Sequence, residues 1–263
     1  MPERREATEK TAKMGEMILG NGAPKICVPV MGKDVSDIAA AAARAYAAGA
    51  DLMELRADSL AAMPTAAQAE AAMRAARENA PGLPLLFTLR TARDGGPGSD
   101  DLEAYEKLLR FAAQSGLCEA IDCELSAGEA AFRSIAACAH EAGVCVVGSS
   151  HEFGEIGDMA RAEKWLKEQE ALGADICKAA VMVRSRTEAL QAALCMARAG
   201  EEISKPMIAI AMGGQGVLTR ICAECIGSCL TFATAGEASA PGQMDAARLR
   251  GVIECIHEAS RRA

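Results

Sequence analysis

Eight short apolar runs recur along the chain, each followed by a longer segment with helical periodicity. The runs cover residues 26–31, 52–55, 85–89, 120–125, 144–148, 176–183, 207–212 and 228–233. Their spacing of roughly thirty residues is the length of one strand-plus-helix unit. Several of the intervening segments carry the pattern of a helix start, at Thr65 with Gln68, Asp100 with Glu103, Ser126 with Glu129 and Ser185 with Glu188. Several are expected to stop at a glycine, at Gly49, Gly116, Gly143 and Gly173.

Eight such units predict an α/β protein with a (β/α)8 TIM barrel, in which continuous apolar strands are buried on both faces. An open doubly wound sheet is the alternative, but the first apolar run is followed by the single glycine Gly32 and no dinucleotide fingerprint. We predict one domain over residues 1–263, since 51% hydrophobic residues are ample for a large core. Residues 1–23 precede the barrel, either as a loose extension or as a hairpin that closes its floor.

Charge and cysteine usage limit the class of partner and compartment. The 28 basic and 36 acidic residues give a net charge of -8, which argues against nucleic acid or an anionic membrane as partner. No apolar run approaches the roughly 18 to 20 residues of a membrane span, and the charged first twenty residues lack a signal-peptide core. The eleven cysteines lie mostly within apolar patterns, as in a reducing compartment. We therefore expect a cytoplasmic protein without disulfides, and no metal site at Cys222 and Cys225, which lack a second pair.

Lys178 interrupts the apolar run 176–183. Burial disfavours the charged ammonium, and a neutral amine is a nucleophile toward carbonyl groups. An enzyme that forms an imine is therefore one interpretation. The other is a lysine at a strand end, whose stem covers apolar surface while its amine reaches water.

Polar residues also follow the other apolar runs, and in a barrel the carboxyl ends of the strands carry the chemistry. These residues are Glu54, Arg56, Arg90, Asp94, Asp122, Glu124, Ser149, Ser150, His151, Arg220 and the segment 239–243. Each also has a structural interpretation: Glu54 with Arg56 as an ion pair between strands, and Asp122 with Glu124 as part of the barrel mouth. Taken together around a lysine and a histidine, they favour an enzyme.

These segments resemble the type I 3-dehydroquinate dehydratases. The matching stretches are 54–58, 87–90 with 94–96, 121–125, 150–153, 173–178, 212–220, 227–232 and 239–243, in the order of that family. The resemblance implies a carbon-oxygen lyase that dehydrates 3-dehydroquinate to 3-dehydroshikimate, either in the shikimate pathway of aromatic amino acid biosynthesis or in the breakdown of quinate. It also implies a homodimer, with neither a metal nor an organic cofactor.

The resemblance further assigns roles to residues of this chain. Lys178 forms the Schiff base, His151 is the general acid and base, and Asp94 lies beside it. Substrate binding is assigned to Glu54, Arg56 and Arg90 at the ring hydroxyls, to Arg220, Ser239 and Gln243 at the carboxylate, and to Met212 and Phe232 at the apolar wall.

Two departures from the family and two rival functions stand beside this assignment. Asp94 replaces a glutamate and is one methylene shorter, so we expect a longer or water-mediated contact with His151; Pro29 replaces a serine. A class I aldolase would need a phosphate site, for which residues 213–216 are a weak candidate. A non-catalytic barrel that binds an anionic metabolite is the other rival. Arg220 together with residues 239–243 is better suited to a carboxylate.

Overall fold

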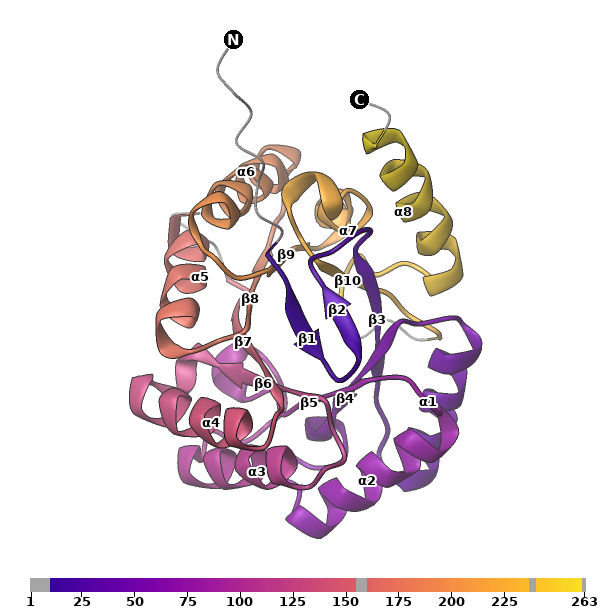
Figure 1. Cartoon of the computed structure of the whole chain (residues 1–263), viewed down its shortest axis with the longest axis vertical. Helices are drawn as coiled ribbons and strands as arrows, with labels where there is room; N and C mark the ends of the chain where they lie inside the picture. Colours follow the sequence, from indigo (N-terminus) through magenta and orange to yellow (C-terminus); the bar gives the residue numbers. More distant parts are fainter. Residues whose placement is uncertain (1–9, 155–159, 237–239, 262–263) are drawn as a thin grey trace.

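The computed structural model describes residues 10–154, 160–236 and 240–261. Eight parallel strands form a nearly closed barrel with helices around it (Figure 1). The strands are β3 (Lys25–Val30), β4 (Leu52–Arg56), β5 (Leu85–Thr88), β6 (Ala120–Glu124), β7 (Cys145–Glu152), β8 (Ile176–Met182), β9 (Met207–Met212) and β10 (Leu230–Phe232). They pair in the order β10-β3-β4-β5-β6-β7-β8-β9. Between β9 and β10 the ring is completed by a single bridge from Met207 to Ser228, so the predicted barrel is confirmed.

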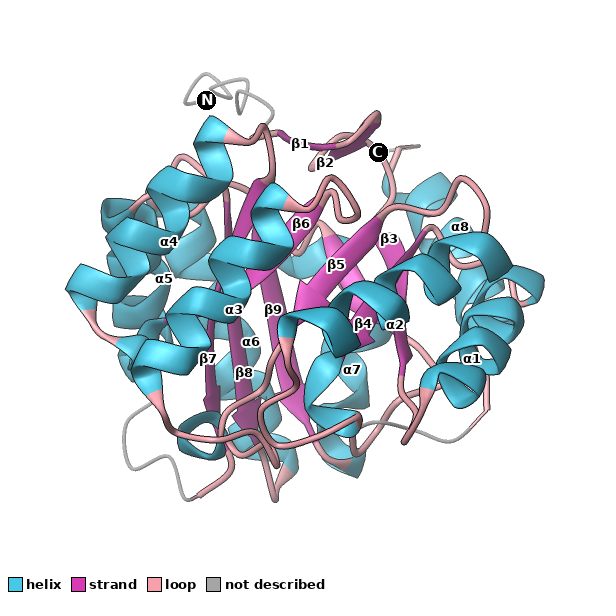
Figure 2. Ribbon diagram, turned by 90° about the horizontal axis from the view of Figure 1, so that it is seen from below, coloured by secondary structure: helices cyan, strands magenta, loops and turns pink. Residues whose placement is uncertain are grey.

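The helices alternate with the strands and cover the outside of the barrel (Figure 2). They are α1 (Val35–Ala47), α2 (Ala66–Asn79), α3 (Leu102–Gln114), α4 (Glu129–Glu141), α5 (Ala160–Leu172), α6 (Arg186–Glu202), α7 (Val217–Ile221) and α8 (Ala246–Ser260). Thr65 caps α2 in a full capping box, and Ser185 caps α6. The predicted cap at Ser126 is wrong, because α4 starts after Gly128 and Ser126 instead donates to Glu124. The cap of α3 is Asp101, one residue later than predicted.

The hairpin of β1 (Ala12–Met14) and β2 (Met17–Leu19) lies across the end of the barrel where the strands begin (Figures 1 and 2). Met14 and Leu19 are fully buried and pack with the side chains that fill the barrel, among them Leu86 and Ile176. Of the two interpretations of the first residues, the hairpin that closes the floor is therefore the one observed. A second apolar layer lies between the strands and the helices.

Strand β7 continues four residues beyond the apolar run 144–148, through Ser149 to Glu152. Apolar periodicity missed this extension because its polar side chains are buried by other polar groups. Ser149, for example, donates to Asp122 and accepts from Arg90. The strand thereby carries His151 to the mouth of the barrel.

Two further sequence-based expectations concern the surface and the cysteines. Within the described ranges, no helix is long and apolar enough to cross a membrane. Seven of the eleven cysteines are buried, at positions 27, 118, 123, 138, 145, 177 and 229. For Cys118, Cys177 and Cys229, burial raises the thiol pKa to about 12, and it raises the pKa of Cys145 well above its usual value, so these side chains behave as small apolar groups.

Candidate active site

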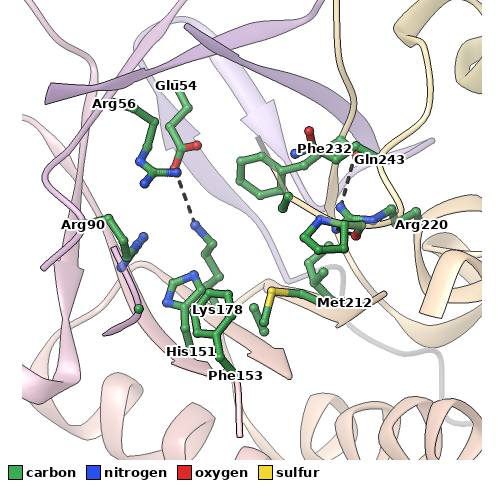
Figure 3. Close-up of a pocket in the computed structure, with 15 residues that line it drawn as sticks. Glu54, Arg56, Arg90, His151, Phe153, Lys178, Met212, Arg220, Phe232 and Gln243 are labelled. Carbon is green, nitrogen blue, oxygen red and sulfur yellow. Dashed lines mark hydrogen bonds and ion pairs between the residues drawn. The ribbon is translucent and has the colours of Figure 1, made fainter. Parts of the chain in front are cut away.

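A pocket opens at the carboxyl ends of the strands and collects most of the predicted site residues (Figure 3). It is lined by Glu54, Arg56, Arg90, Gly95, His151, Phe153, Lys178, Ala180, Ile210, Met212, Arg220, Phe232, Ala240, Pro241 and Gln243. Asp94 lies behind His151 and contacts it. Ser239 lies outside the described residues. Every other residue that the sequence assigned to catalysis or substrate binding faces this one cavity.

Lys178 projects from β8 into the pocket and is 4% exposed. Its Nζ donates to Asp122 Oδ2 at 3.0 Å, lies 3.6 Å from Glu54 Oε1, and sits 4.7 Å from the centre of the Phe232 ring. The interpretation of a lysine whose amine reaches water is therefore excluded. Two carboxylates and an aromatic ring therefore surround the amine within the pocket.

His151 is held by Asp94 through two contacts to one oxygen. Asp94 Oδ2 lies 3.0 Å from His151 Nδ1 and accepts from the His151 main-chain N-H at 3.1 Å. The expected longer or water-mediated contact is therefore wrong. The short turn Ala92–Asp94, which ends at Gly95 in the left-handed region (φ +75°), brings the shorter side chain close enough.

The ionisation of this pair suits a base at the pocket. Burial, together with the charges of Arg90 and Lys178, lowers the pKa of His151 to about 3 despite the nearby carboxylate. Burial alone would raise the pKa of Asp94, but the hydrogen bond and charge of His151 and the charge of Arg90 bring it below its usual value. A neutral imidazole that donates Nδ1-H to an ionised Asp94 keeps the lone pair of Nε2 free.

Arg90 connects the remaining carboxylates of the mouth into one network. It donates to Glu124 Oε1 at 2.7 Å and to Asp122 Oδ2 at 2.9 Å. Burial opposes ionisation of Asp122, yet the charges of Arg90 and Lys178 hold its pKa well below the usual value. For Glu124 burial prevails and raises the pKa to about 7. Asp122 is therefore a permanent anion shared by Arg90 and Lys178.

Glu54 and Arg56 both line the pocket, but they do not pair with each other in the way the sequence suggested. Arg56 makes a bidentate ion pair with Asp58, with contacts of 3.0 and 2.8 Å. Glu54 accepts from Thr88 at 3.0 Å. Asp58 in turn accepts from the main-chain N-H of Arg90, so the ends of β4 and β5 are tied together beneath the site.

Arg220 occupies the opposite side of the pocket from this network (Figure 3). Its guanidinium donates only to the carbonyl oxygens of Phe232 and Pro241, at 3.4 and 3.3 Å, and its buried Nε has no partner among the described residues. Burial lowers its pKa to about 10. A buried cation without a carboxylate is poorly compensated, so this end of the pocket is built to receive an anion.

The arrangement can bind a small molecule that has a carboxylate at one end and a carbonyl at the other. The amine of Lys178 can condense with the carbonyl, and the imidazole of His151 can move protons. Across the described ranges, no group of three or more His, Cys, Asp or Glu side chains has the arrangement of a metal site.

Sequence reasoning underestimated Asp122 and missed Phe153. Asp122 was interpreted as barrel-mouth structure, although it contacts Lys178 directly. Phe153 lies two residues after His151 and stacks near its ring, with 6.5 Å between the ring centres. The two-residue period of a strand placed Phe153 on the same side as His151 and would have identified it.

Comparison with known proteins agrees with this geometry. The family model for type I 3-dehydroquinase matches residues 26–260. The 3-dehydroquinate dehydratase of Salmonella agona is 36% identical over 251 residues, which is 95% of this chain and the full length of that protein. Crystal structures of 3-dehydroquinate dehydratases are also similar. The Geobacillus kaustophilus structure has a TM-score of 0.91 at 31% identity and covers 95% of this chain and 98% of that one. A Clostridium difficile type I structure with covalently modified comenic acid has a TM-score of 0.90 at 30% identity, covering 96% and 99%.

Proposed function

The chain belongs to the type I 3-dehydroquinase family and is a hydro-lyase that dehydrates 3-dehydroquinate, and we propose that Lys178 and His151 carry out this reaction through an imine. One observation carries the proposal: a single pocket at the mouth of the barrel holds both the lysine amine and a histidine whose pKa is lowered to about 3. An amine nucleophile next to a neutral imidazole base supplies both groups that imine chemistry needs.

In the first half of the reaction, Lys178 Nζ attacks the C3 carbonyl carbon after losing a proton. His151 shuttles protons while the carbonyl oxygen leaves as water, and a protonated imine forms. The carboxylates of Asp122 and Glu54, at 3.0 and 3.6 Å from the amine, stabilise its positive charge.

In the second half, the protonated imine withdraws electrons from the neighbouring carbon C2. Neutral His151 removes a C2 proton and leaves an enamine, which then expels the C1 hydroxyl. The protonated His151 gives its proton to that leaving group, and water hydrolyses the imine to release 3-dehydroshikimate. Imine formation and hydrolysis exchange one water, so the net change is the loss of one water. Asp94 keeps the imidazole in the tautomer that this sequence requires.

The substrate is oriented by the difference in charge between the two ends of the pocket. We assign its carboxylate to Arg220, a buried guanidinium to which the described residues offer no ion pair, with Gln243 beside it. Its ring hydroxyls then face Glu54, Arg56 and Arg90, while Met212 and Phe232 form the apolar wall. Ser239 belongs to the same set by its place in the family motif.

Borohydride trapping tests this assignment. Incubation of the enzyme with 3-dehydroquinate and borohydride should add the mass of the reduced ligand to the peptide that contains Lys178, and the Lys178→Ala variant should gain none. Labelling by a sugar phosphate instead would favour the aldolase mechanism. Absence of labelling with either compound would support a barrel that only binds an anionic metabolite.

We also propose a homodimeric enzyme of the cytoplasm that serves aromatic amino acid biosynthesis. The family resemblance supports the dimer and the pathway, and the many free cysteines support a reducing compartment. Light scattering on the purified protein measures the molar mass, and a value near 27.3 kDa would contradict the dimer.

A further inference from the structure

Gln169 is a fully buried polar side chain on α5, outside the barrel. Its Oε1 accepts from the main-chain N-H of Lys178 at 2.9 Å. Its Nε2 donates to the main-chain oxygen of Lys178 at 3.0 Å and to Ser150 Oγ at 3.1 Å. One side-chain amide therefore binds both main-chain groups of the imine-forming residue and the residue next to His151. We call these three hydrogen bonds the Gln169 clamp.

The three hydrogen bonds of the Gln169 clamp can form in only one orientation of the side-chain amide. The oxygen faces the N-H of Lys178, and the two N-H groups face two acceptors. Rotating the amide by 180° would set its NH2 group against the N-H of Lys178 and its oxygen against a carbonyl. Because the amide is buried, such a mismatch would be costly, so the contact fixes both its position and its direction.

Strand β7 makes room for the stem of Gln169. At Gly148 an added Cβ would lie 2.9 Å from Gln169 Cβ and 3.0 Å from its Cγ, which is too close for any side chain. Gly148 is three residues before His151 on the same strand. The glycine and the glutamine together let an outer helix reach the seam between β7 and β8, where Ser149 aligns with Lys178.

We propose that Gln169 is a positioning residue that fixes the amine of Lys178 relative to the imidazole of His151. It acts from behind the strands, since it touches neither the pocket nor a reacting atom. By holding the Lys178 main chain and Ser150 through one rigid amide, it sets the relation between β8 and β7 where the two catalytic side chains leave them. This inference rests on the proposed role of Lys178 as the imine-forming residue.

The first test replaces Gln169 by leucine, which keeps much of the volume and removes all three hydrogen bonds. A misplaced amine should lower kcat by about 10- to 100-fold, because small displacements of a reacting group are costly. KM should stay within about twofold, since Arg220 and the pocket wall are unchanged. The matched control is Leu166→Ala, which removes a buried side chain from the same helix and creates a cavity without removing a hydrogen bond.

Gln169→Glu gives a readout that a purely structural role would not. A protonated glutamic acid can accept from the N-H of Lys178 and donate to its carbonyl oxygen, but an ionised carboxylate cannot donate. Burial favours the protonated form. The ratio of variant to wild-type kcat should therefore rise as the pH falls from 8 to 5.5. Ser150→Ala, which removes one of the three bonds, should lower kcat by only about two- to fivefold.

Single-turnover borohydride trapping separates the possible failures. If wild-type Lys178 is not labelled, the proposed function fails. If the wild type is labelled and Gln169→Leu is labelled at the same rate with unchanged kcat, the positioning role is refuted. A loss of kcat that matches Leu166→Ala at equal stability refutes it as well. Should the leucine variant not fold, a pH-independent ratio for Gln169→Glu overturns the proposal by itself.

Discussion

Carboxylate side chains occur at both rims of the barrel, the floor and the mouth, but they have different functions there. At the floor, the carboxylates of Asp51, Glu119 and Asp175 lie directly before β4, β6 and β8. Each accepts the N-H of a residue at or near the start of the strand before it, at Ile26, Leu85 and Val146, with distances of 2.7 to 2.9 Å. Each also binds a basic side chain from a nearby helix, Arg250, Arg77 or His140 respectively. The same arrangement of a carboxylate, a main-chain N-H and a basic side chain thus recurs on alternate strands around the ring.

The carboxylates of the mouth are buried and shared, whereas those of the floor are half-exposed and separate. The side chains of Asp122 and Glu124 are 0 and 1% exposed and both bind Arg90, while Glu119 and Asp175 at the floor are 23 and 29% exposed. Solvent screens the floor pairs, so each contributes little and acts nearly alone. At the mouth every charge depends on several others. The floor carboxylates therefore serve stability, whereas the mouth carboxylates serve the reaction. This difference comes from burial and from shared charged partners more than from residue type.

Exchanging one lysine at each rim should show the largest difference. Lys178→Ala removes the nucleophile and should lower turnover by at least about 10³-fold. Lys205→Ala removes a half-exposed floor lysine 3.9 Å from Asp175 and should leave turnover within about twofold. Steady-state dehydration of 3-dehydroquinate measures both, and wild-type turnover in Lys178→Ala would contradict the mechanism.

Neutralising a carboxylate at the mouth should cost far more stability than at the floor. Asp122→Asn leaves Arg90 and Lys178 short of a buried counter-charge and should lower the free energy of unfolding by about 3 to 5 kcal/mol. Urea unfolding followed by circular dichroism measures this change. A loss below about 1 kcal/mol would mean that the mouth network is as loosely coupled as the floor pairs.

Protonation of His151 should weaken the fold in acid. The pKa of His151 is about 3 in the folded protein and roughly 6.5 when unfolded, so between these values the unfolded chain binds a proton that the folded chain does not. His151 alone should therefore lower the free energy of unfolding below pH 6.5, by at most about 1.4 kcal/mol per pH unit, whereas Glu124, whose pKa burial raises to about 7, acts in the opposite sense between about pH 7 and 4.5. The lowered pKa of Asp94 adds a further loss only below about pH 4. Urea unfolding at pH 7, 6 and 5 should therefore show the His151 contribution as a loss of wild-type stability relative to His151→Asn that grows as the pH falls, and a difference that does not change with pH would contradict it.

Adding one methylene to a carboxylate side chain should have a smaller effect on turnover, and this effect should again differ between the two rims. Asp94 already lies 3.0 Å from His151, and Phe153 packs against the adjoining Gly95, so Asp94→Glu should displace the imidazole and lower kcat by about tenfold. Asp175→Glu should be tolerated at the floor, where Glu119 already performs the same task. Equal turnover in Asp94→Glu and the wild type would show that the mouth accommodates the longer side chain.

The smallest effect is expected from Asp175→Asn. The variant keeps an acceptor for Val146 N-H and loses only a half-exposed charge beside His140, so the free energy of unfolding should fall by about 1 kcal/mol or less. Turnover should not change. A loss of several kcal/mol would place the floor carboxylates in the same class as Asp122.

The sequence was sufficient where a local rule decided the structure. Apolar runs and glycines placed the barrel units, and polar strand ends placed Lys178, His151 and Arg220 around one pocket. The glycines Gly49 and Gly173, each two residues before Asp51 or Asp175, were visible in the sequence, but the function of the two carboxylates was not. That function requires knowing which N-H of the neighbouring strand each carboxylate meets.

Where the outcome depended on partners distant in the chain, sequence patterns failed. Ser126 resembled a helix cap but donates to Glu124. Asp122 carried a structural interpretation as part of the barrel mouth, because its contacts with Arg90 and Lys178 come from distant parts of the chain. No sequence pattern identified Gln169, because its reach to β8 depends on the absence of a side chain at Gly148 on another strand.

The ring of strands is incomplete between β9 and β10, and this break lies on one side of the pocket only. Strand β8 aligns six residues with each neighbour, whereas β9 and β10 meet at the single bridge from Met207 to Ser228. Lys178 and His151 stand on the continuous side, while Arg220 stands on the five-residue helix α7 beside the gap. The residue that binds the acid group of the substrate and the residues that react with the substrate ring therefore lie on separate elements of the barrel. Substitutions on α7 are therefore expected to change the binding of the acid group more than the placement of the reacting amine.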